Sequence, residues 1–363
     1  MKVFLDTNVF YNNWFASNPN FKMLFRYLNN EGEELLLSDL VVQEVENIRN
    51  RELSESLSEI KRHVKSIQKL TPSTVSFDES TLNISEYKLI DYVEHRVESL
   101  SGVGYGSISH EELVYRALNS VKPFSGQEKG YRDSLIWLSF LDYLDKQNID
   151  GDVAFITNNK HDFFSYEKKS WVLHPELKKD LIDKSIGANV IPFLNIYDFV
   201  NSQVDKDEHL VDRYKLTNEF DDYLMEQTLE HLIALDNDGL SEVFSNKLFK
   251  DKLTPVIDIQ GDNWDIVDDT EIINVSKISD TEAYVSCQYI CSGVNLDITI
   301  DLNEYHQYKS DIDSIRECYE VRTDPNTQTA VIALGFKAYT QATLVYDTVK
   351  EEPIELHVEG ICP

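Results

Sequence analysis

The apolar residues in the first two hundred positions of the chain gather into short runs. The first run begins at Val3 and leads straight into Asp6, and three more follow at residues 34–38, 152–157 and 189–193. Short runs that are apolar on both faces are typical of strands buried in a parallel sheet. We therefore expect parallel strands in this half of the chain.

Between these runs the apolar spacing changes to that of helices. Helices are predicted at residues 21–28 and 131–144. Another is predicted to begin at Ser38 or Asp39, to bury Val41, Val45 and Ile48, and to continue as a charged amphipathic helix over 52–70. Strands that alternate with helices predict an α/β domain with three layers, α/β/α, and a parallel sheet. The glycine-rich segment 101–106 has no Lys-Ser or Lys-Thr ending, so we expect a flexible connection or a lid rather than a phosphate-binding loop.

The pattern changes after a polar stretch at residues 201–208. Helical spacing is present at 210–235 and 240–248, and apolar and polar residues then alternate, which is typical of half-exposed strands. Ser292 and Gly293 are expected to turn the chain between two of these strands. Five strands are predicted, at residues 283–290, 294–300, 329–336, 339–346 and 354–361. We expect an α/β domain at 1–203 and an α+β domain with an antiparallel sheet at 204–363.

The negative charge of the chain is concentrated in its second half. The formal net charge is −30 at pH 7; residues 1–200 hold 22 Lys and Arg against 30 Asp and Glu, and residues 201–363 hold 12 against 34. Such an acidic surface repels phosphate backbones, so a nucleic acid is expected to bind the first half. We interpret the acidic half either as a site for a basic protein partner or as a competitor of nucleic acid.

Composition excludes several other classes of protein. The chain is 42% hydrophobic, and no apolar run approaches the roughly 20 residues that a membrane span needs. We therefore expect a cytoplasmic protein without a membrane partner. The four cysteines have no C-x-x-C spacing, so reduced thiols are expected rather than a disulfide framework or a zinc site. The numerous aromatic residues are attributed to core packing.

Acidic and amide side chains follow the predicted elements in an order that favours a metal site. Asp6 ends the first strand, Glu44 falls on the apolar stripe of the second helix, and Asp133 lies in the first turn of an apolar helix. Asn159 and Asp162 follow a later strand. The ends of these elements can meet at one edge of a parallel sheet. Oxygen ligands gathered there suit Mg²⁺ or Mn²⁺.

Three of these residues also have simpler interpretations. Asp6 is a suitable cap for a turn or a helix. Glu44 would either extend its carboxylate to solvent or pair with one of two basic residues, Arg49 or Lys61. Asp133 stands where any helix favours a carboxylate.

Four segments carry a family resemblance: Asp6-Thr7-Asn8, Glu44, residues 130–137 and residues 155–163. In this order they resemble the motifs of PIN-domain nucleases, especially the larger bacterial PIN-like proteins with an additional C-terminal domain. The resemblance covers residues 1 to about 200 and implies metal-dependent hydrolysis of single-stranded RNA.

The resemblance also implies roles for individual residues. Asp6, Glu44 and Asp133 would bind the metal and act in catalysis, with hydrogen-bonding support from Thr7, Asn8, Thr157 and Asn158. Many PIN domains carry aspartate where this chain has Asn159, so both Asn159 and Asp162 are candidates for the last metal position. Asp162 would then also act in catalysis; the alternative is that it only caps a helix.

Basic residues flank these motifs and are candidates for nucleic-acid binding, although a solvated face would also explain them: Lys129, Arg132, Lys160, Lys168 and Lys169. Two rival functions are a non-catalytic PIN-like module that binds RNA or protein and a structure-specific DNA nuclease of the flap type. A toxin or phage-defence role is consistent with the resemblance, and a homo-oligomer stays open.

Overall fold

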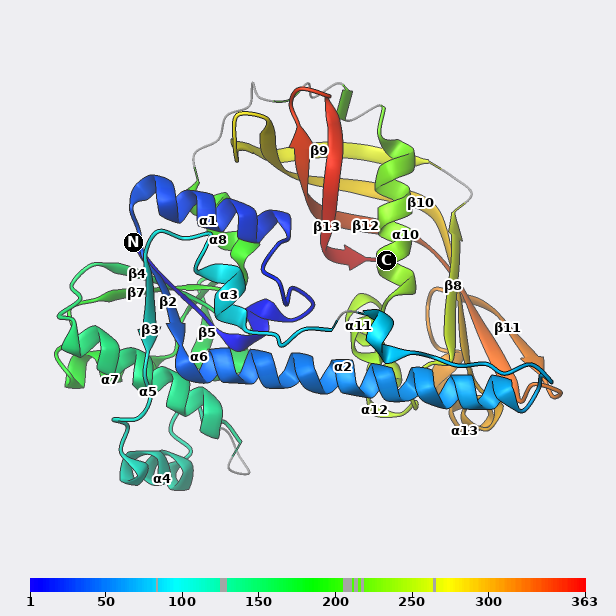
Figure 1. Cartoon of the computed structure of the whole chain (residues 1–363), viewed down its shortest axis with the longest axis horizontal. Coiled ribbons are helices and arrows are strands. Elements are labelled where there is room, and N and C mark those ends of the chain that lie inside the picture. Colours follow the sequence, from blue (N-terminus) through cyan, green and yellow to red (C-terminus); the bar gives the residue numbers. More distant parts are fainter. Residues whose placement is uncertain (83, 125–128, 205–210, 212–214, 217–218, 264–265) are drawn as a thin grey trace. The chain divides into compact units, whose positions relative to one another are not determined.

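The computed structural model describes residues 1–363 apart from 83, 125–128, 205–210, 212–214, 217–218 and 264–265. The chain divides into two compact units, Met1–Gln203 and Val204–Pro363 (Figure 1). None of the helices in the described ranges is long and apolar enough to cross a membrane.

The sheet of the first unit is parallel throughout, as predicted. Its strands lie in the order β3-β2-β1-β4-β7. They comprise β1 (Lys2–Leu5), β2 (Leu35–Ser38), β3 (Leu100–Val103), β4 (Asp152–Ile156) and β7 (Asn189–Phe193). The central position of β1 explains why Val3, Phe4 and Leu5 are all fully buried.

The helices of this unit are α1 (Pro19–Glu31), α2 (Asp39–Gln68), α3 (Leu89–Val93), α4 (His110–Asn119), α5 (Tyr131–Lys146), α6 (Lys160–Phe163), α7 (Pro175–Asp183) and α8 (Ile196–Gln203), with 3-10 turns at Thr7–Phe10 and Glu79–Leu82. A separate hairpin consists of β5 (Phe164–Glu167) and β6 (Ser170–Leu173).

Helices cover both faces of the sheet. On one face, the ring of Phe4 lies 4.9 Å from that of Phe140 in α5. Register places Phe193 of β7 on the opposite face, where its ring lies 5.2 Å from that of Phe199 in α8. Phe199 also contacts Tyr27 of α1, at 5.4 Å. The unit therefore has the predicted three layers, α/β/α.

Helix α2 is one continuous helix of 30 residues that includes the apolar stripe at 41–48 and the charged continuation predicted from residue 52. Ser38 caps it, since its hydroxyl oxygen accepts a hydrogen bond from the Leu40 amide at 3.2 Å. The predicted apolar stripe at 41–48 is buried, but beyond Leu57 the helix is largely exposed.

The glycine-rich segment forms a strand, so the prediction of a loop or lid was wrong for its first residues. Leu100–Val103 is β3, which pairs with β2 at the edge of the sheet. A Cβ atom added to Gly102 would lie 3.4 Å from Asp39 Oδ1 at the start of α2. This is an ordinary van der Waals distance, so the pairing of Gly102 with Leu37 of β2, and not a steric need for glycine, makes the segment a strand.

The second unit contains an antiparallel sheet, as predicted. Its order is β11-β12-β10-β8, with β13 paired to β12 and β9 paired to β10. The strands are β8 (Asp258–Asn263), β9 (Val267–Lys277), β10 (Glu282–Asp301), β11 (Cys318–Asp324), β12 (Thr329–Asp347) and β13 (Glu352–Cys362). The helices are α10 (Asp221–Ile233), α11 (Asn237–Val243), α12 (Leu248–Asp251) and α13 (Leu302–Ile312). The predicted helix at 210–235 begins partly outside the described residues.

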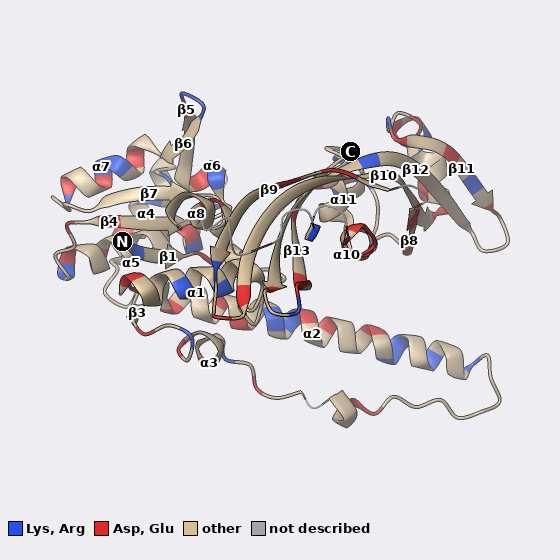
Figure 2. Ribbon diagram, turned by 90° about the horizontal axis from the view of Figure 1, so that it is seen from above, with Lys and Arg blue, Asp and Glu red and all other residues tan. Residues whose placement is uncertain are grey.

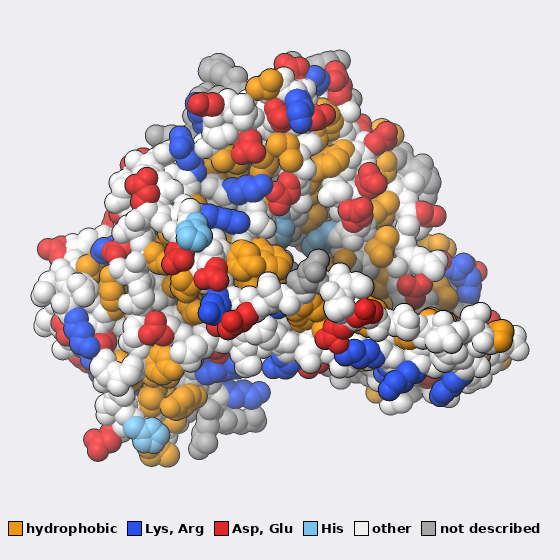
Figure 3. Space-filling model, in the orientation of Figure 1, with side chains coloured by type: hydrophobic (Ala, Val, Ile, Leu, Met, Phe, Trp, Pro, Cys, Tyr) orange, Lys and Arg blue, Asp and Glu red, His pale blue; other side chains and the backbone are white. Residues whose placement is uncertain are grey.

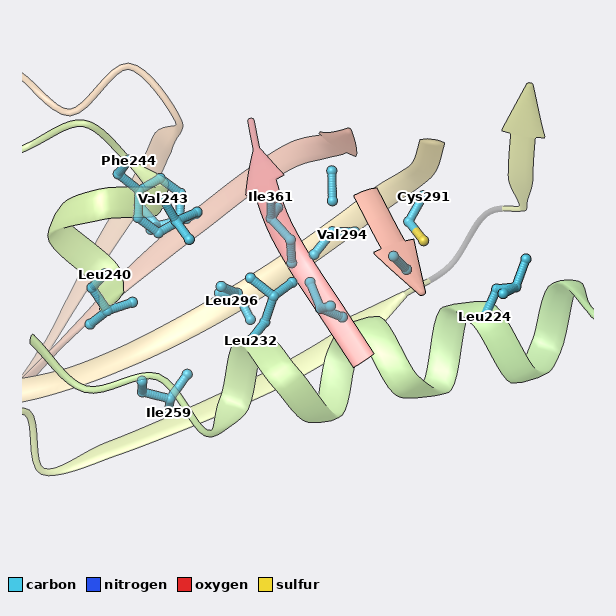
Figure 4. Close-up of a cluster of buried hydrophobic side chains, with 14 of the residues drawn as sticks. Leu224, Leu232, Leu240, Val243, Phe244, Ile259, Cys291, Val294, Leu296 and Ile361 are labelled. Atoms are coloured by element: carbon cyan, nitrogen blue, oxygen red, sulfur yellow. The ribbon is translucent and has the colours of Figure 1, made fainter. Parts of the chain in front are cut away.

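Helix α10 closes the core of the second unit against the sheet (Figure 4). Leu224 and Leu232 on the helix are buried in the same apolar cluster as Leu296 of β10 and Ile361 of β13. Burial of this apolar area is the main stabilising contribution to such a unit.

The predicted turn at Ser292 and Gly293 was wrong. Residues 282–301 form one strand, β10, which pairs with β12 on both sides of this point. The register shifts between Cys291 and Val294, and Gly293 has a φ of +72°. These residues therefore form a β-bulge, which glycine accommodates without reversing the chain.

Gly130 gives the first prediction, because it fixes the start of α5. Its φ is +107°, and an added Cβ would lie 2.6 Å from the Pro123 carbonyl oxygen. Replacement Gly130→Ala should lower the free energy of unfolding by about 1–3 kcal/mol, measured by chemical denaturation. Gly151→Ala is the control, since its Cβ would meet nothing within 4 Å. Equal losses in both variants would contradict the strain at Gly130.

Candidate functional site

Asp6 lies at the carboxyl end of β1 and is only 3% exposed. Its Oδ1 accepts a hydrogen bond from the Thr7 amide at 2.7 Å. Its Oδ2 accepts one from the Thr157 hydroxyl at 2.6 Å and a longer one from the Asn8 side-chain amide at 3.3 Å. The carboxylate is therefore held in one orientation by groups from the ends of β1 and β4.

The end of β4 supplies a small network around Asp6. The side-chain amide of Asn8 donates to Thr157 Oγ1 at 3.1 Å, and Asn8 Oδ1 accepts a hydrogen bond from the backbone N–H of Asn158 at 3.0 Å. The backbone N–H of Asn159 donates a hydrogen bond to Thr157 Oγ1 at 3.0 Å. These contacts follow from the pairing of β1 with β4, which sets Leu5 opposite Ile156.

Glu44 reaches the same region from α2. Its Oε2 accepts a hydrogen bond from Thr7 Oγ1 at 2.8 Å, and its Oε1 forms an ion pair with Arg132 Nη1 at 2.6 Å. Compensation of Glu44 by a basic side chain was one of the two interpretations, but neither Arg49 nor Lys61 provides it. Arg49 lies over the Tyr87 ring, and Lys61 pairs with Glu79.

Asp133 stands in the first turn of α5, as predicted. Its Oδ1 accepts a hydrogen bond from the Asn159 side-chain amide at 3.1 Å. Burial raises the pKa of Asp133, and the charges of Asp162 and Glu44 raise it further, whereas Asn159 and Arg132 act in the opposite direction. Asp133 is therefore close enough to both other carboxylates to sense their charge.

Asp162 lies in the short helix α6 and faces a lysine. Its Oδ1 is 3.3 Å from Lys122 Nζ, which also donates to the His161 carbonyl at 2.9 Å. Lys122 was missed in the sequence, because nothing in the pattern around it connects it to residue 162. Only the fold brings the two together.

The carboxylates influence one another's pKa values within a largely buried cluster. Burial is the largest cause that raises the pKa of Asp6, to about 7, and the charges of Asp133 and Glu44 add to it. The Thr157 and Thr7 hydrogen bonds partly counteract these effects. Residues from β1, α2 and α5 thus converge electrostatically at one edge of the sheet.

The chemistry of this donor set fits a hard divalent cation. Carboxylate oxygens that repel one another in a buried site are what Mg²⁺ or Mn²⁺ would stabilise. Within the described ranges, however, no three His, Cys, Asp or Glu side chains already stand as a ready metal-binding group. Each carboxylate is instead held by protein donors: Thr157 at Asp6, Arg132 at Glu44, Asn159 at Asp133 and Lys122 at Asp162.

The basic candidates have different surroundings. Lys129 is exposed, and Arg132 combines its ion pair to Glu44 with a side chain that is 69% exposed. Lys160 Nζ lies 5.8 Å from the centre of the Trp171 ring. Lys168 and Lys169 form the turn of the β5–β6 hairpin, whose tip is basic in Figure 2.

The hairpin itself was missed in the sequence analysis. The stretch 164–171, Phe-Ser-Tyr-Glu-Lys-Lys-Ser-Trp, alternates apolar and polar residues around a two-residue turn, which is a hairpin signal. Its aromatic residues had been attributed to the core. That attribution is correct for Phe164, but Tyr166 is 62% exposed.

Comparison with known protein families gives a match to part of the chain. Residues 3–163 match a family model described as PIN domain. Neither the curated proteins nor the solved structures contain a match to this chain.

The pKa of Asp6 predicts how stability depends on pH in the absence of divalent cations. Folding raises the pKa of Asp6 from 3.8 to about 7. Between these two pH values the folded protein therefore keeps a proton on Asp6 that the unfolded chain releases. The associated stability is complete below pH 4 and is lost as the pH rises through 7, by a few kcal/mol at about 1.4 kcal/mol per pKa unit. Asp6→Asn should remove this loss.

The measurement is the free energy of unfolding of both proteins from pH 4 to 8 in a chelator. Asp145→Asn, which removes an exposed carboxylate from α5, is the control and should follow the wild type. If Asp6→Asn shows the same pH dependence as the wild type, the buried carboxylate does not titrate in this window.

Proposed function

Because residues 3–163 of this chain belong to the PIN-domain family, we propose that it is a Mg²⁺- or Mn²⁺-dependent endoribonuclease that hydrolyses mainly single-stranded RNA. PIN domains are generally metal-dependent nucleases, so the fold is of the nuclease type. RNA as the substrate and the identity of the metal are the specific parts of the proposal.

The observation that carries the proposal is the electrostatic coupling of Asp6, Glu44 and Asp133. They come from a strand end and two helices, yet Glu44 and Asp133 both raise the pKa of Asp6. A protein gains no stability from this arrangement, so a functional reason is favoured. In our proposal these three side chains hold the cation, which supplies Lewis-acid chemistry for phosphodiester hydrolysis when bound.

The neighbouring residues have positioning roles in this proposal. Thr157, Thr7 and Asn8 orient the two carboxylate oxygens of Asp6. Asn158 supports the same arrangement, since its amide donates to Asn8. Hydrogen-bonded partners of this kind determine the geometry and basicity of metal-binding carboxylates.

Asn159 and Asp162 receive different roles. Asn159 uses its side-chain amide nitrogen to donate to Asp133, which supports a positioning role, although its side-chain oxygen is also a possible ligand atom. Asp162 raises the pKa of Asp133 by its charge and is paired with Lys122, which supports Asp162 as the additional acidic group of the centre.

Arg132 links the carboxylates to the substrate in this proposal. It pairs with Glu44 through a side chain that is largely exposed, so the same guanidinium group would be able to contact a substrate phosphate. Together with Lys129, Lys160, Lys168 and Lys169, it would supply the positive charge that a phosphate backbone requires.

The second unit is proposed to regulate the nuclease or to bind a basic protein partner. Several of its described basic residues are engaged in ion pairs with acidic neighbours, such as Lys250 with Asp238 and Lys252 with Asp311. Residues 201–363 hold 34 Asp and Glu against 12 Lys and Arg. Figure 3 shows acidic side chains interspersed with basic ones on one face of the whole chain. The excess of acidic over basic residues in the second unit supports binding of a basic protein partner or repulsion of nucleic acid. Cytoplasmic location, a toxin or defence role and a homo-oligomer belong to the same proposal.

Substitution of the proposed ligands tests the function. Asp6→Asn and Asp133→Asn should each lower metal-dependent cleavage of labelled single-stranded RNA by at least about tenfold to a hundredfold, because each removes a negatively charged ligand. Asp145→Asn on the same helix as Asp133 should cleave like the wild type. Equal activity of all four proteins would refute the proposed site.

Two further measurements separate the rival functions. Parallel digestion of single-stranded RNA, single-stranded DNA and flap DNA distinguishes the ribonuclease from a structure-specific DNA nuclease. Calorimetric titration with Mn²⁺ should show binding to the wild type that Asp133→Asn weakens. A wild-type protein that binds no Mn²⁺ and cleaves none of the substrates would be a non-catalytic module.

A further inference from the structure

The β5–β6 hairpin is separate from both larger sheets and stands out from the first unit (Figure 2). Its base is anchored, since Phe164 and Leu173 are buried and pair with each other across the two strands. The outer part has no such packing: residues 166–170 are all exposed. The hairpin is therefore rooted in the core and presents its outer half to solvent.

An aromatic pair lies on this exposed half. Tyr166 and Trp171 are directly opposite each other in the strand register, and their ring centres are 5.1 Å apart with an interplanar angle of 58°. Tyr166 is 62% exposed. The pair thus offers aromatic surface that the core of the domain does not use.

Positive charge surrounds these rings. Lys160 Nζ lies 5.8 Å from the centre of the Trp171 ring, within the range of a cation–π interaction. Lys168 and Lys169 occupy the turn with φ angles of +48° and +69° and are exposed. One acidic residue, Glu167, belongs to the hairpin, where it accepts a hydrogen bond from Ser165 at 3.3 Å.

The chain leads directly from the candidate site to this hairpin. Asn159, which donates to Asp133, immediately precedes Lys160. Helix α6 then runs into Phe164, the first residue of β5. The carboxylates and the aromatic pair are consequently connected through one short, partly buried segment.

We propose that Tyr166 and Trp171, together with Lys160, form a base-stacking platform that holds an unpaired nucleotide of a single-stranded nucleic acid beside the carboxylate site. Aromatic rings flanked by lysines are the usual means of binding single strands without sequence preference, because every base has a face that stacks. Bases within a duplex are already stacked on each other, so the platform selects single strands. The nuclease role of the adjacent site rests on the proposed function.

The alternative is that the aromatic pair only stabilises the hairpin, in which case loss of the rings would not change the preference for normal over abasic strands. Cross-strand aromatic pairs stabilise hairpins, so alanine variants would confuse loss of binding with loss of the hairpin. The double variant Tyr166→Val with Trp171→Val removes both rings but keeps β-branched residues that favour strands. Tyr115→Val is the matched control, because Tyr115 is also 62% exposed but belongs to α4.

The experiment measures binding of fluorescent oligonucleotides by anisotropy in the full-length Asp133→Asn background, in which metal-dependent cleavage is expected to be strongly reduced. Three probes are compared: a single-stranded RNA, a strand of equal length in which most nucleotides are abasic, and the RNA annealed to its complement. The protein should bind the normal strand at least about tenfold more tightly than the abasic strand. The Tyr166→Val, Trp171→Val variant should bind both strands equally weakly, and Tyr115→Val should retain the preference.

The outcomes distinguish this inference from the proposed function. Equal binding of normal and abasic strands, an unchanged preference in the double valine variant or no binding of any probe would overturn the platform. A base-dependent preference that the double variant loses would support the platform even if the wild-type protein cleaved none of its substrates, in which case only the nuclease proposal would fail.

Discussion

The parallel pairing of β1 with β4 is the constraint on which the candidate site depends. It sets Leu5 opposite Ile156, so that the residues directly after the two strands, Asp6 and Thr157, lie within 2.6 Å hydrogen-bonding distance. Because both strands are buried on both faces, a shift in their register would place apolar side chains in the wrong layer. The packing of the sheet core therefore determines the orientation of Asp6.

The acidic centre is stable as a structure because each carboxylate has a protein donor. Asp6 depends on neutral donors and is raised in pKa to about 7, whereas Glu44 retains a full countercharge in Arg132. Removal of Arg132 would leave the charge of the largely buried Glu44 without this partner and would lower the stability of the folded state. This arrangement keeps the cluster intact without a cation, yet leaves electrostatic repulsion that a cation would relieve.

The two units differ in how charge is used. In the first unit, basic residues gather at defined places, such as the hairpin turn formed by Lys168 and Lys169. In the second, acidic residues are in large excess over residues 201–363. The acidic excess of the second unit favours repulsion of a phosphate backbone, whereas the hairpin turn offers local positive charge on a first unit that is itself net acidic.

The sequence by itself determined the elements whose signals are local. The runs at β1, β2, β4 and β7 and the apolar helix α5 were recognisable, because buried strands and helices impose a composition on consecutive residues. Asp6 and Asp133 were located by their positions at the ends of such elements. The order of the motifs along the chain also indicated the PIN-domain family, whose model matches residues 3–163.

The tertiary structure decided everything that depends on contacts between distant segments. Glu44 is compensated by Arg132 and Asp162 faces Lys122, although other lysines and arginines are nearer in the sequence. Gly102 belongs to a strand because it pairs with Leu37 of β2, a contact between segments far apart in the sequence. An aromatic residue has the same local signal whether it is buried or exposed, so only the fold distinguished Tyr166 on the hairpin from the rings of the core.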